Sequence, residues 1–149
     1  MNQEKLPNLF RPLAFYHPVS DNSGIATSFS YNSGEDKLYL NILPQTGYDE
    51  ETFRGFFSGE GKKVVKFSQV EASCIARCID KGQGFDVVHS FNNIRNEICF
   101  APLESREYEL TIQYSEGDQE KIFRTELEIG ELNLLRLYIE SAIQESFYN

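Results

Sequence analysis

Cations and aromatic rings recur at alternate positions in two short segments of this chain. These segments are Lys37-Leu-Tyr-Leu-Asn-Ile42 and Lys62-Lys-Val-Val-Lys-Phe67. Successive side chains of a β-strand point to opposite faces, so each segment would present its polar residues on one surface. Ammonium groups attract phosphates without reading sequence, and aromatic rings stack on bases for about 1–3 kcal/mol per base. The pattern therefore predicts a surface suited to a single-stranded nucleic acid.

Neighbouring strands and turns would add further polar and aromatic residues to that surface. Lysines would attract phosphates, and Tyr31, Tyr39 and Phe91 would stack on bases. A structural alternative is that outward lysines protect sheet edges from aggregation while the phenylalanines are core. The candidate nucleic-acid-binding set is Tyr31, Lys37, Tyr39, Asn41, Lys62, Lys63, Lys66, Phe91 and Arg95.

Catalytic and metal-binding motifs are not apparent in the sequence. It contains no nucleophile elbow, phosphate loop or metal-binding helix motif. His89, in an expected strand, is better explained as a surface or hydrogen-bonded histidine than as a catalytic base. Three cysteines (Cys74, Cys78, Cys99) fit no disulfide framework, and we expect them to be buried small hydrophobic residues. We therefore expect a non-enzymatic protein with no metal and no cofactor.

Charge is distributed unevenly along the chain. The formal net charge is −9, which argues against a generally basic nucleic-acid-binding protein. Residues 1–66 nevertheless carry 7 basic against 8 acidic groups, whereas residues 107–149 carry 3 basic against 10 acidic groups. The lysine cluster thus lies in the nearly neutral half. The acidic half supports an alternative function, an oligomeric protein–protein interaction module without nucleic-acid binding.

Length and composition indicate one globular domain. At 149 residues, with 40% hydrophobic and 25% charged residues, the chain is large enough to bury a substantial core. No stretch approaches the roughly 20 apolar residues of a membrane helix. Residues 1–12 lack an apolar core and an arginine run, so we expect no targeting segment and a cytoplasmic location.

A repeated pattern about 60 positions apart organises the expected elements. Phe67 to Ile79 matches Leu127 to Ile139 without gaps, and the helix-entry glutamates Glu71 and Glu131 coincide. With the same shift, Leu38 and Leu40 align with Ile98 and Phe100. A unit too small to bury both faces of its sheet is usually stabilised by a second copy.

The repeat predicts an α+β fold built from two ββββα units, each an antiparallel sheet followed by one helix. We expect an irregular N-terminal arm over 1–23, or an early edge segment within it, and one domain over 24–149, with repeat one at 24–82 and repeat two at 84–147. Ser68-x-x-Glu71 is a capping box, and Gly82 would end the first helix after about Lys81. Further expected strands cover 25–31, 37–43, 62–67, 85–91, 97–101, 108–114 and 121–127, with a short one around 53–57.

The second helix, expected over about 131–147, is apolar around more of its circumference than one sheet face requires. Leu134, Leu135 and Ile139 lie on its expected buried stripe, and Leu132, Leu137 and Tyr138 extend the apolar surface. Part of this helix would therefore contact another subunit, which predicts a homo-oligomer, either a dimer or a tetramer.

This order of elements resembles the Whirly family of single-stranded DNA-binding proteins, together with the related mitochondrial guide-RNA-binding proteins and positive-cofactor (PC4-like) coactivators. The family's Lys-Gly-Lys-Ala signature is absent, and the corresponding turn reads Ser33-Gly-Glu-Asp-Lys37. The resemblance implies crossed sheets, helices at the centre of an oligomer, and single-stranded DNA, in preference to RNA, lying across outer sheet faces in transcription or replication. It covers about residues 24–147 and rests on 24–30, 37–44, 63–71, 85–89, 98–103 and 123–143.

Overall fold

A computed structural model describes residues 11–148, which form two antiparallel sheets and two helices. The first sheet has the strand order β1–β2–β3–β5, with β4 paired to the far end of β3, and the second has the order β6–β7–β8–β9. One helix follows each sheet, as the sequence predicted. The elements are β1 (Leu13–His17), β2 (Ile25–Asn32), β3 (Lys37–Asp49), β4 (Arg54–Phe57), β5 (Lys63–Ser68), α1 (Gln69–Lys81), β6 (Phe85–Phe91), β7 (Ile94–Pro102), β8 (Tyr108–Glu116), β9 (Gln119–Leu127) and α2 (Ile129–Ser146).

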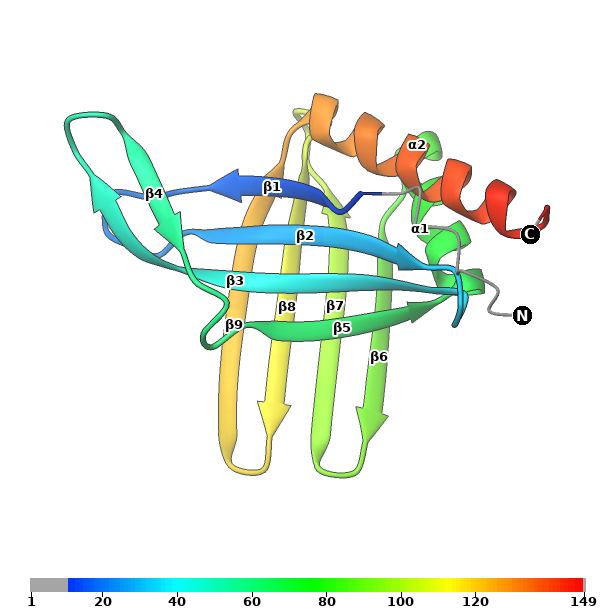
Figure 1. Ribbon diagram of the computed structural model, residues 1–149, viewed down its shortest axis with the longest axis horizontal. Helices are drawn as coiled ribbons and strands as arrows, with labels where there is room; N and C mark the ends of the chain where they lie inside the picture. The colour runs from blue at the N-terminus through cyan, green and yellow to red at the C-terminus, as the bar shows by residue number, and fades with distance from the viewer. Residues whose placement is uncertain (1–10, 149) are drawn as a thin grey trace, which may run out of the picture.

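The two sheets cross steeply and share one core (Figure 1). Leu38, Leu40 and Ile42 on β3 are fully buried, as are Leu110 and Ile112 on β8. The two helices pack against each other and close one end of the space between the sheets. Most of the inner face of each sheet is therefore covered by the other sheet and by the helices, and the outer faces remain free.

Local sequence signals explain where the helices begin and end. The Ser68 hydroxyl accepts a hydrogen bond from the Glu71 amide, and the Glu71 carboxylate accepts one from the Ser68 amide. Gly82 adopts a left-handed conformation, with φ 66°, and ends α1 as predicted. In α2 the Glu131 carboxylate accepts from the Glu128 amide, and the helix begins two residues earlier than predicted, at Ile129.

The repeat is present, but one part of the predicted alignment is wrong. Phe67 pairs with Leu38, and its counterpart Leu127 pairs with Tyr108. Leu38 therefore corresponds to Tyr108, about 70 positions later, and not to Ile98. The segment between β3 and β5 is longer than the segment between β8 and β9. This difference shifts the alignment of the residues before it from about 60 to about 70 positions.

The additional residues form a projecting hairpin that the second half lacks. β3 pairs with β5 over Lys37–Ile42, and after a bulge between Gln45 and Gly47 it continues outward and pairs with β4. Figure 1 shows this β3–β4 arm extending away from both sheets. The expected strand over 37–43 is therefore longer in the structure, Lys37–Asp49, and the short strand around 53–57 is confirmed as β4.

The expected irregular arm over 1–23 is wrong for Leu13–His17, where the alternative of an early edge segment is confirmed as the edge strand β1. The three prolines in this region suggested irregular structure, but Pro12 and Pro18 only bracket the strand. An edge strand tolerates such neighbours because one side of it needs no hydrogen-bond partner. Residues 1–10 of that expected arm lie outside the described residues.

The expectation of three buried cysteines is also wrong. Cys74 is exposed on α1, and Cys78 and Cys99 are half-buried. Cys99 lies on the outer side of β7, where burial, together with the carboxylates of Asp86 and Glu109, raises the pKa of its thiol. All three are free thiols, so the expected lack of a disulfide framework agrees with the structure.

Two histidine–glutamate pairs join the halves reciprocally. His17, the fifth residue of β1, contacts Glu131 of α2 at 2.7 Å, and His89, the fifth residue of β6, contacts Glu71 of α1 at 2.7 Å. His17 Nδ1 also hydrogen-bonds the hydroxyl of Thr125 on β9. Each pair connects the first strand of one half to the capping glutamate of the other, so helix capping and the docking of the two halves depend on the same carboxylates.

Replacing Glu71 with Gln tests this dual role. Burial alone would raise the pKa of Glu71, but hydrogen bonds from His89 and the Ser68 amide hold this pKa below its usual value. A lowered folded-state pKa stabilises the protein above the unfolded-state value, and this contribution is lost as pH falls through the folded-state value. We expect Glu71→Gln to reduce the free energy of unfolding by about 1–2 kcal/mol at pH 7, and by clearly less below about pH 4.

Urea unfolding at both pH values measures this difference, and Glu97→Gln, which changes an exposed carboxylate paired with Arg95, is the control. A loss of equal size at both pH values would contradict the assigned role of the Glu71 carboxylate.

Candidate nucleic-acid interface

The outer face of the first sheet carries the aligned polar residues that the sequence predicted for β3 and β5. Tyr39 lies between Ser30 on β2 and Lys66 on β5, and Asn41 lies between Ser28 and Val64. Lys37 forms a third row with Asn32 and Ser68. Pairing of β3 with both neighbours thus brings Lys37, Tyr39, Asn41 and Lys66 onto one surface.

A cation and a ring meet at the centre of this face. The Lys66 Nζ lies 5.1 Å from the centroid of the Tyr39 ring, and the Tyr39 hydroxyl donates a hydrogen bond to the Glu35 carboxylate. An exposed cation–π contact is worth only about 0.5–1 kcal/mol. Lys66 can therefore move from the ring toward a phosphate at small cost and leave the ring to a base.

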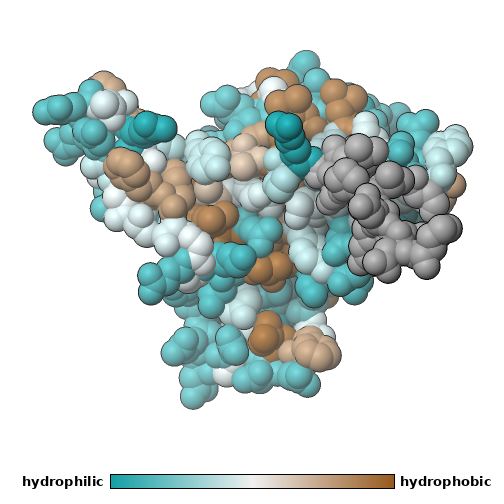
Figure 2. Space-filling view, viewed as in Figure 1, coloured by the Kyte–Doolittle hydropathy of each residue, from teal (hydrophilic) through white to brown (hydrophobic). Residues whose placement is uncertain are grey.

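The two outer faces differ in charge. The outward positions of β1, β2, β5 and the first half of β3 carry no acidic side chain. The outward positions of β6 to β9 carry two arginines, Arg95 and Arg124, against five acids: Asp86, Glu97, Glu109, Glu120 and Glu126. Figure 2 views the molecule from the side of the first sheet and shows polar side chains interspersed with apolar ones across it. The negative charge of the strands is thus concentrated on the opposite face.

The three lysines of the second cluster surround one strand edge. β5 is an edge strand of the first sheet, with Lys66 exposed on its outer face and Lys62 exposed in the turn before it. Lys63 points the other way, toward the second sheet, where its Nζ lies 4.6 Å from the centroid of the Tyr114 ring. The lysines therefore lie on both sides of the β5 edge.

The second sheet extends beyond this edge, so that its inner face is uncovered there (Figure 1). Phe91 ends β6 on this overhang and is 74% exposed. Tyr114 and Lys121, which pair between β8 and β9, lie on the same side of the sheet. We call the surface formed by Lys63, Phe91, Tyr114 and Lys121 the step. It continues from the outer face of the first sheet around β5.

Tyr31 does not belong to the interface, and its expected stacking role is wrong. It alternates onto the inner side of β2 and is 1% exposed. Its hydroxyl accepts a hydrogen bond from the Gln69 side chain, and its backbone amide donates to the Tyr138 hydroxyl. Burial raises the pKa of Tyr31. A ring held inside the core cannot stack on a base.

Arg95 is exposed, but it lies on the opposite side of the molecule from the lysines. It projects from the outer face of β7 and forms an ion pair with Glu97 at 2.7 Å. Five carboxylates share that face, so Arg95 contributes no free positive surface there. Of the nine predicted residues, the structure brings together Lys37, Tyr39, Asn41, Lys62 and Lys66 on one side of the β5 edge, and Lys63 and Phe91 on the other.

Three residues at this surface were missing from the predicted set. Tyr114 and Lys121 contribute to the step, and Tyr16 is 62% exposed on β1, where its ring contacts Phe57 of the arm. The sequence does contain a signal for Tyr16. Residues 13–17 alternate in the way typical of a strand, with Leu13, Phe15 and His17 on one side and Ala14 and Tyr16 on the other. No local signal distinguishes Tyr114 from the buried tyrosine of the same strand, because its exposure depends on where the first sheet ends.

No group of three metal-ligating side chains occurs among residues 11–148. Neither helix in that range combines the length and apolarity needed to cross a bilayer.

Comparison with solved structures identifies the architecture. The chain superimposes on the Whirly protein WHY1 from Arabidopsis thaliana with a TM-score of 0.69, at 10% identity, covering 91% of this chain and 89% of that one. The fold is Whirly-like. A guide-RNA-binding protein complex bound to a guide RNA matches with a TM-score of 0.70, at 12% identity, over 93% of each chain.

The trypanosome MRP1/MRP2 structure gives a TM-score of 0.69 at 13% identity, covering 93% of this chain and 87% of that one. No protein-family model and no curated protein sequence matches the chain. At this level of identity the comparison establishes the shared fold, and the resemblance predicted from the sequence is confirmed for the Whirly-like architecture.

Proposed function

We propose that this protein is a non-enzymatic single-stranded nucleic-acid-binding protein and that its physiological ligand is single-stranded DNA in preference to RNA. The observation that carries the proposal is the outer face of the first sheet, whose outward strand positions carry lysines and no acid, with Glu35 of the β2–β3 turn reaching Tyr39 from the side. This face continues around β5 onto the step. Whirly-like neighbours of known ligand support it, since one of them was solved with a guide RNA bound. Another is described as a plant transcriptional regulator, which supports a role in transcription and a DNA ligand.

The strand would run over the β5 edge, with its phosphates near Lys37, Lys62 and Lys66 on one side and Lys63 and Lys121 on the other. Tyr39 would stack on one base, and Phe91 on another beyond the edge. Asn41 would hydrogen-bond a base or sugar. Lysines contact phosphates without distinguishing sequence, so binding should be salt-sensitive and weakly specific.

The protein would act as a homo-oligomer that associates through its helices. Leu134 and Leu137 of α2 are 52% and 45% exposed, and Val70 of α1 is 73% exposed. Leu132, expected outside the buried stripe, is buried, whereas Leu134, expected within it, is exposed. The predicted surplus of apolar surface on α2 is thus present in the structure, and burial in a dimer or tetramer would cover it.

A second candidate function rests on the acidic outer face of the second sheet. Its five carboxylates against two arginines suit a basic protein partner. Retention on single-stranded DNA cellulose at low salt with release at moderate salt supports the first function, and flow-through at low salt supports this one.

The Lys62→Glu/Lys66→Glu double variant tests the interface. At about 50 mM salt we expect a loss of more than about tenfold in affinity for an oligothymidine, and a salt dependence that is shallower by about 1.4 in log–log slope, because two phosphate contacts are lost. Fluorescence anisotropy over a salt series measures both quantities.

The Arg95→Glu/Arg124→Glu double variant is the matched control, since it changes the net charge equally on the opposite sheet. It should bind within about threefold of the parent protein, because the added charges lie far from the strand and are screened. Equal losses in the two variants would mean that net charge, and not the proposed face, governs binding.

Tyr39→Ala should weaken binding by about tenfold or more, because one stacked base contributes about 1–3 kcal/mol. Tyr31→Phe is the comparison at a buried tyrosine. It should leave affinity unchanged but lower the free energy of unfolding by about 0.5–1.5 kcal/mol, since the hydrogen bond from Gln69 is lost. Anisotropy titrations and urea unfolding of both variants separate the roles, and unchanged affinity in Tyr39→Ala would exclude stacking on this ring.

Leu134→Glu/Leu137→Glu should convert the oligomer to a monomer, because burying two carboxylates in an apolar interface is strongly unfavourable. Light scattering coupled to gel filtration gives the mass. Val88→Glu/Ile122→Glu alters a comparably exposed apolar pair on the outer face of the second sheet and should leave the mass unchanged. A parent protein that is already monomeric would refute the oligomer proposal.

A further inference from the structure

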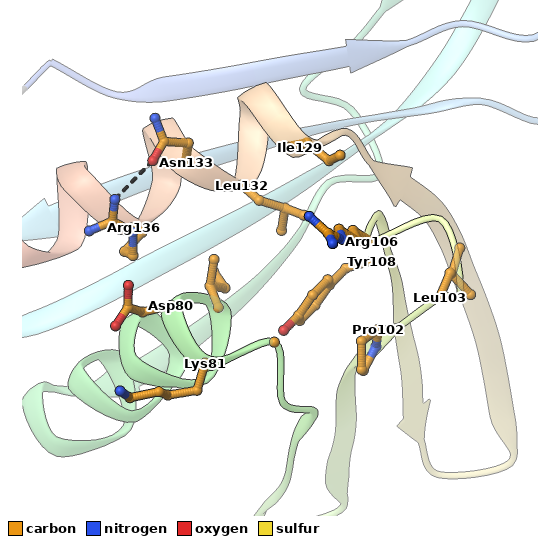
Figure 3. A pocket seen from close by; sticks show the side chains of 12 residues that line it. Asp80, Lys81, Pro102, Leu103, Arg106, Tyr108, Ile129, Leu132, Asn133 and Arg136 are labelled. Carbon is orange, nitrogen blue, oxygen red and sulfur yellow. Dashed lines mark hydrogen bonds between the residues drawn. The ribbon is translucent and has the colours of Figure 1, made fainter.

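We propose that the cleft beside the end of α1 binds a small organic anion, an apolar body bearing a carboxylate or sulfonate group. The cleft has a volume of about 510 Å³, within the range of small-molecule sites. It lies where the last turn of α1, the first turns of α2 and the β7–β8 turn meet (Figure 3). The inference goes beyond nucleic-acid binding and does not depend on it, since the cleft lies away from the outer face of the first sheet.

Two arginines from different elements supply the positive charge of the cleft. Figure 3 shows Arg106 extending from the β7–β8 turn between Leu132 and Tyr108. Arg136 comes from α2, where Asn133 and Glu140 accept hydrogen bonds from its guanidinium at 2.9 and 3.1 Å. Guanidinium groups bind carboxylates and related anions through paired hydrogen bonds. The Arg136 side chain is partly neutralised by Glu140, so Arg106 would be the principal anion contact.

The remaining walls favour an apolar body and carry little opposing charge. Ile79, Leu103, Ile129 and Leu132 line the cleft, and Asp80 is the acidic residue of its lining. Lys81 extends away from the cavity in Figure 3. The Tyr108 hydroxyl donates to the carbonyls of Cys78 and Gln83, which fixes the ring as a wall of the cleft. The lining thus places the Arg106 cation beside apolar surface.

The backbone at Arg106 indicates that its side chain has a specific role. Arg106 has φ 72°, and the corresponding residue of the first half, Asp36, has φ 52°. Aspartate tolerates this left-handed region because its short side chain bonds locally, whereas arginine has no such advantage. Residues held in sparsely populated backbone conformations cluster at ligand sites. The turn itself therefore does not explain an arginine here, but an anion contact does.

The pseudo-symmetric position in the first half is arranged differently, with a smaller cavity of about 380 Å³ between α1 and α2 that includes Ser73, Ala76, Ile139 and Glu140 in its lining. α2 has 18 residues and α1 has 13, so α2 extends further past the corresponding turn. There the Gln69 amide donates to the hydroxyls of Tyr31 and Ser146, joining β2, α1 and the last turn of α2. α1 ends at Gly82 and has no such extension, and the larger of the two cavities lies beside its end.

Titration with 8-anilinonaphthalene-1-sulfonate, an organic anion with an apolar body, tests the proposal by fluorescence and by amide chemical-shift mapping. We expect one saturable site per chain, with shifts at Gly82, Leu103 and Ile129, and competition by decanoate but not by decanol. Arg106→Gly, which suits the positive φ and should fold, is expected to weaken binding more than tenfold, and Arg136→Gln severalfold.

Arg124→Gln removes an arginine from the outer face of the second sheet and should bind the probe like the parent protein. Unchanged affinity in Arg106→Gly, shifts confined to the exposed face around Leu134 and Leu137, or no saturable binding would each overturn the proposal. None of these outcomes affects oligothymidine binding, so the cleft and the proposed interface are tested separately.

Discussion

Each half of this chain supplies the surface that buries the other half. Neither sheet has a helix layer broad enough to cover its inner face alone, and the crossed arrangement resolves this by facing the two apolar sides toward one core. The reciprocal pairs His17–Glu131 and His89–Glu71 attach the first strand of each half to the helix of the other. Because this packing uses both inner faces, a function of the sheets is confined to their outer faces and to edges where one sheet extends past the other.

Because only the outer faces and edges are available, the net charge of −9 does not describe the charge that a ligand on one face would encounter. An average charge describes long-range repulsion, whereas a bound strand experiences the local field within about 10 Å at moderate salt. The two sheets largely separate the signs, because five acidic side chains of β6 to β9 alternate outward on the side of the molecule opposite Lys37, Lys62 and Lys66, and Glu116, which accepts a hydrogen bond from Tyr114, is the exception. An acidic chain can therefore present a neutral-to-cationic face, and repulsion from its far side would add salt dependence without preventing contact.

Local signals predicted most of the fold, and long-range geometry explains the rest. The capping box at Ser68 and Glu71, the left-handed Gly82 and the alternation of β3 and β8 are each readable within a few residues. The burial of Tyr31 and of Tyr39 cannot be told apart from the few residues around each of them. Tyr31 is buried because its strand register places it against α2, and Tyr39 is half-buried on the outer face because it is one residue out of phase with the apolar positions. The correspondence of Leu38 with Tyr108 is likewise visible only in the structure, because it depends on β3 pairing with β5 although β4 lies between them in the sequence.

The halves share a plan but differ where additional structure is attached, and the candidate sites follow those differences. The first half gained the β3–β4 arm and the lysine-bearing edge strand, whereas the second half has the acidic outer face and the long α2. An exact repeat would have given two equivalent faces and two equivalent helix ends. Instead the shorter α1 leaves a cleft beside Arg106, and the first sheet stops short of Phe91 and Tyr114. The differences between the two related halves therefore place the candidate nucleic-acid surface on one side of the molecule and the candidate small-ligand cleft on another.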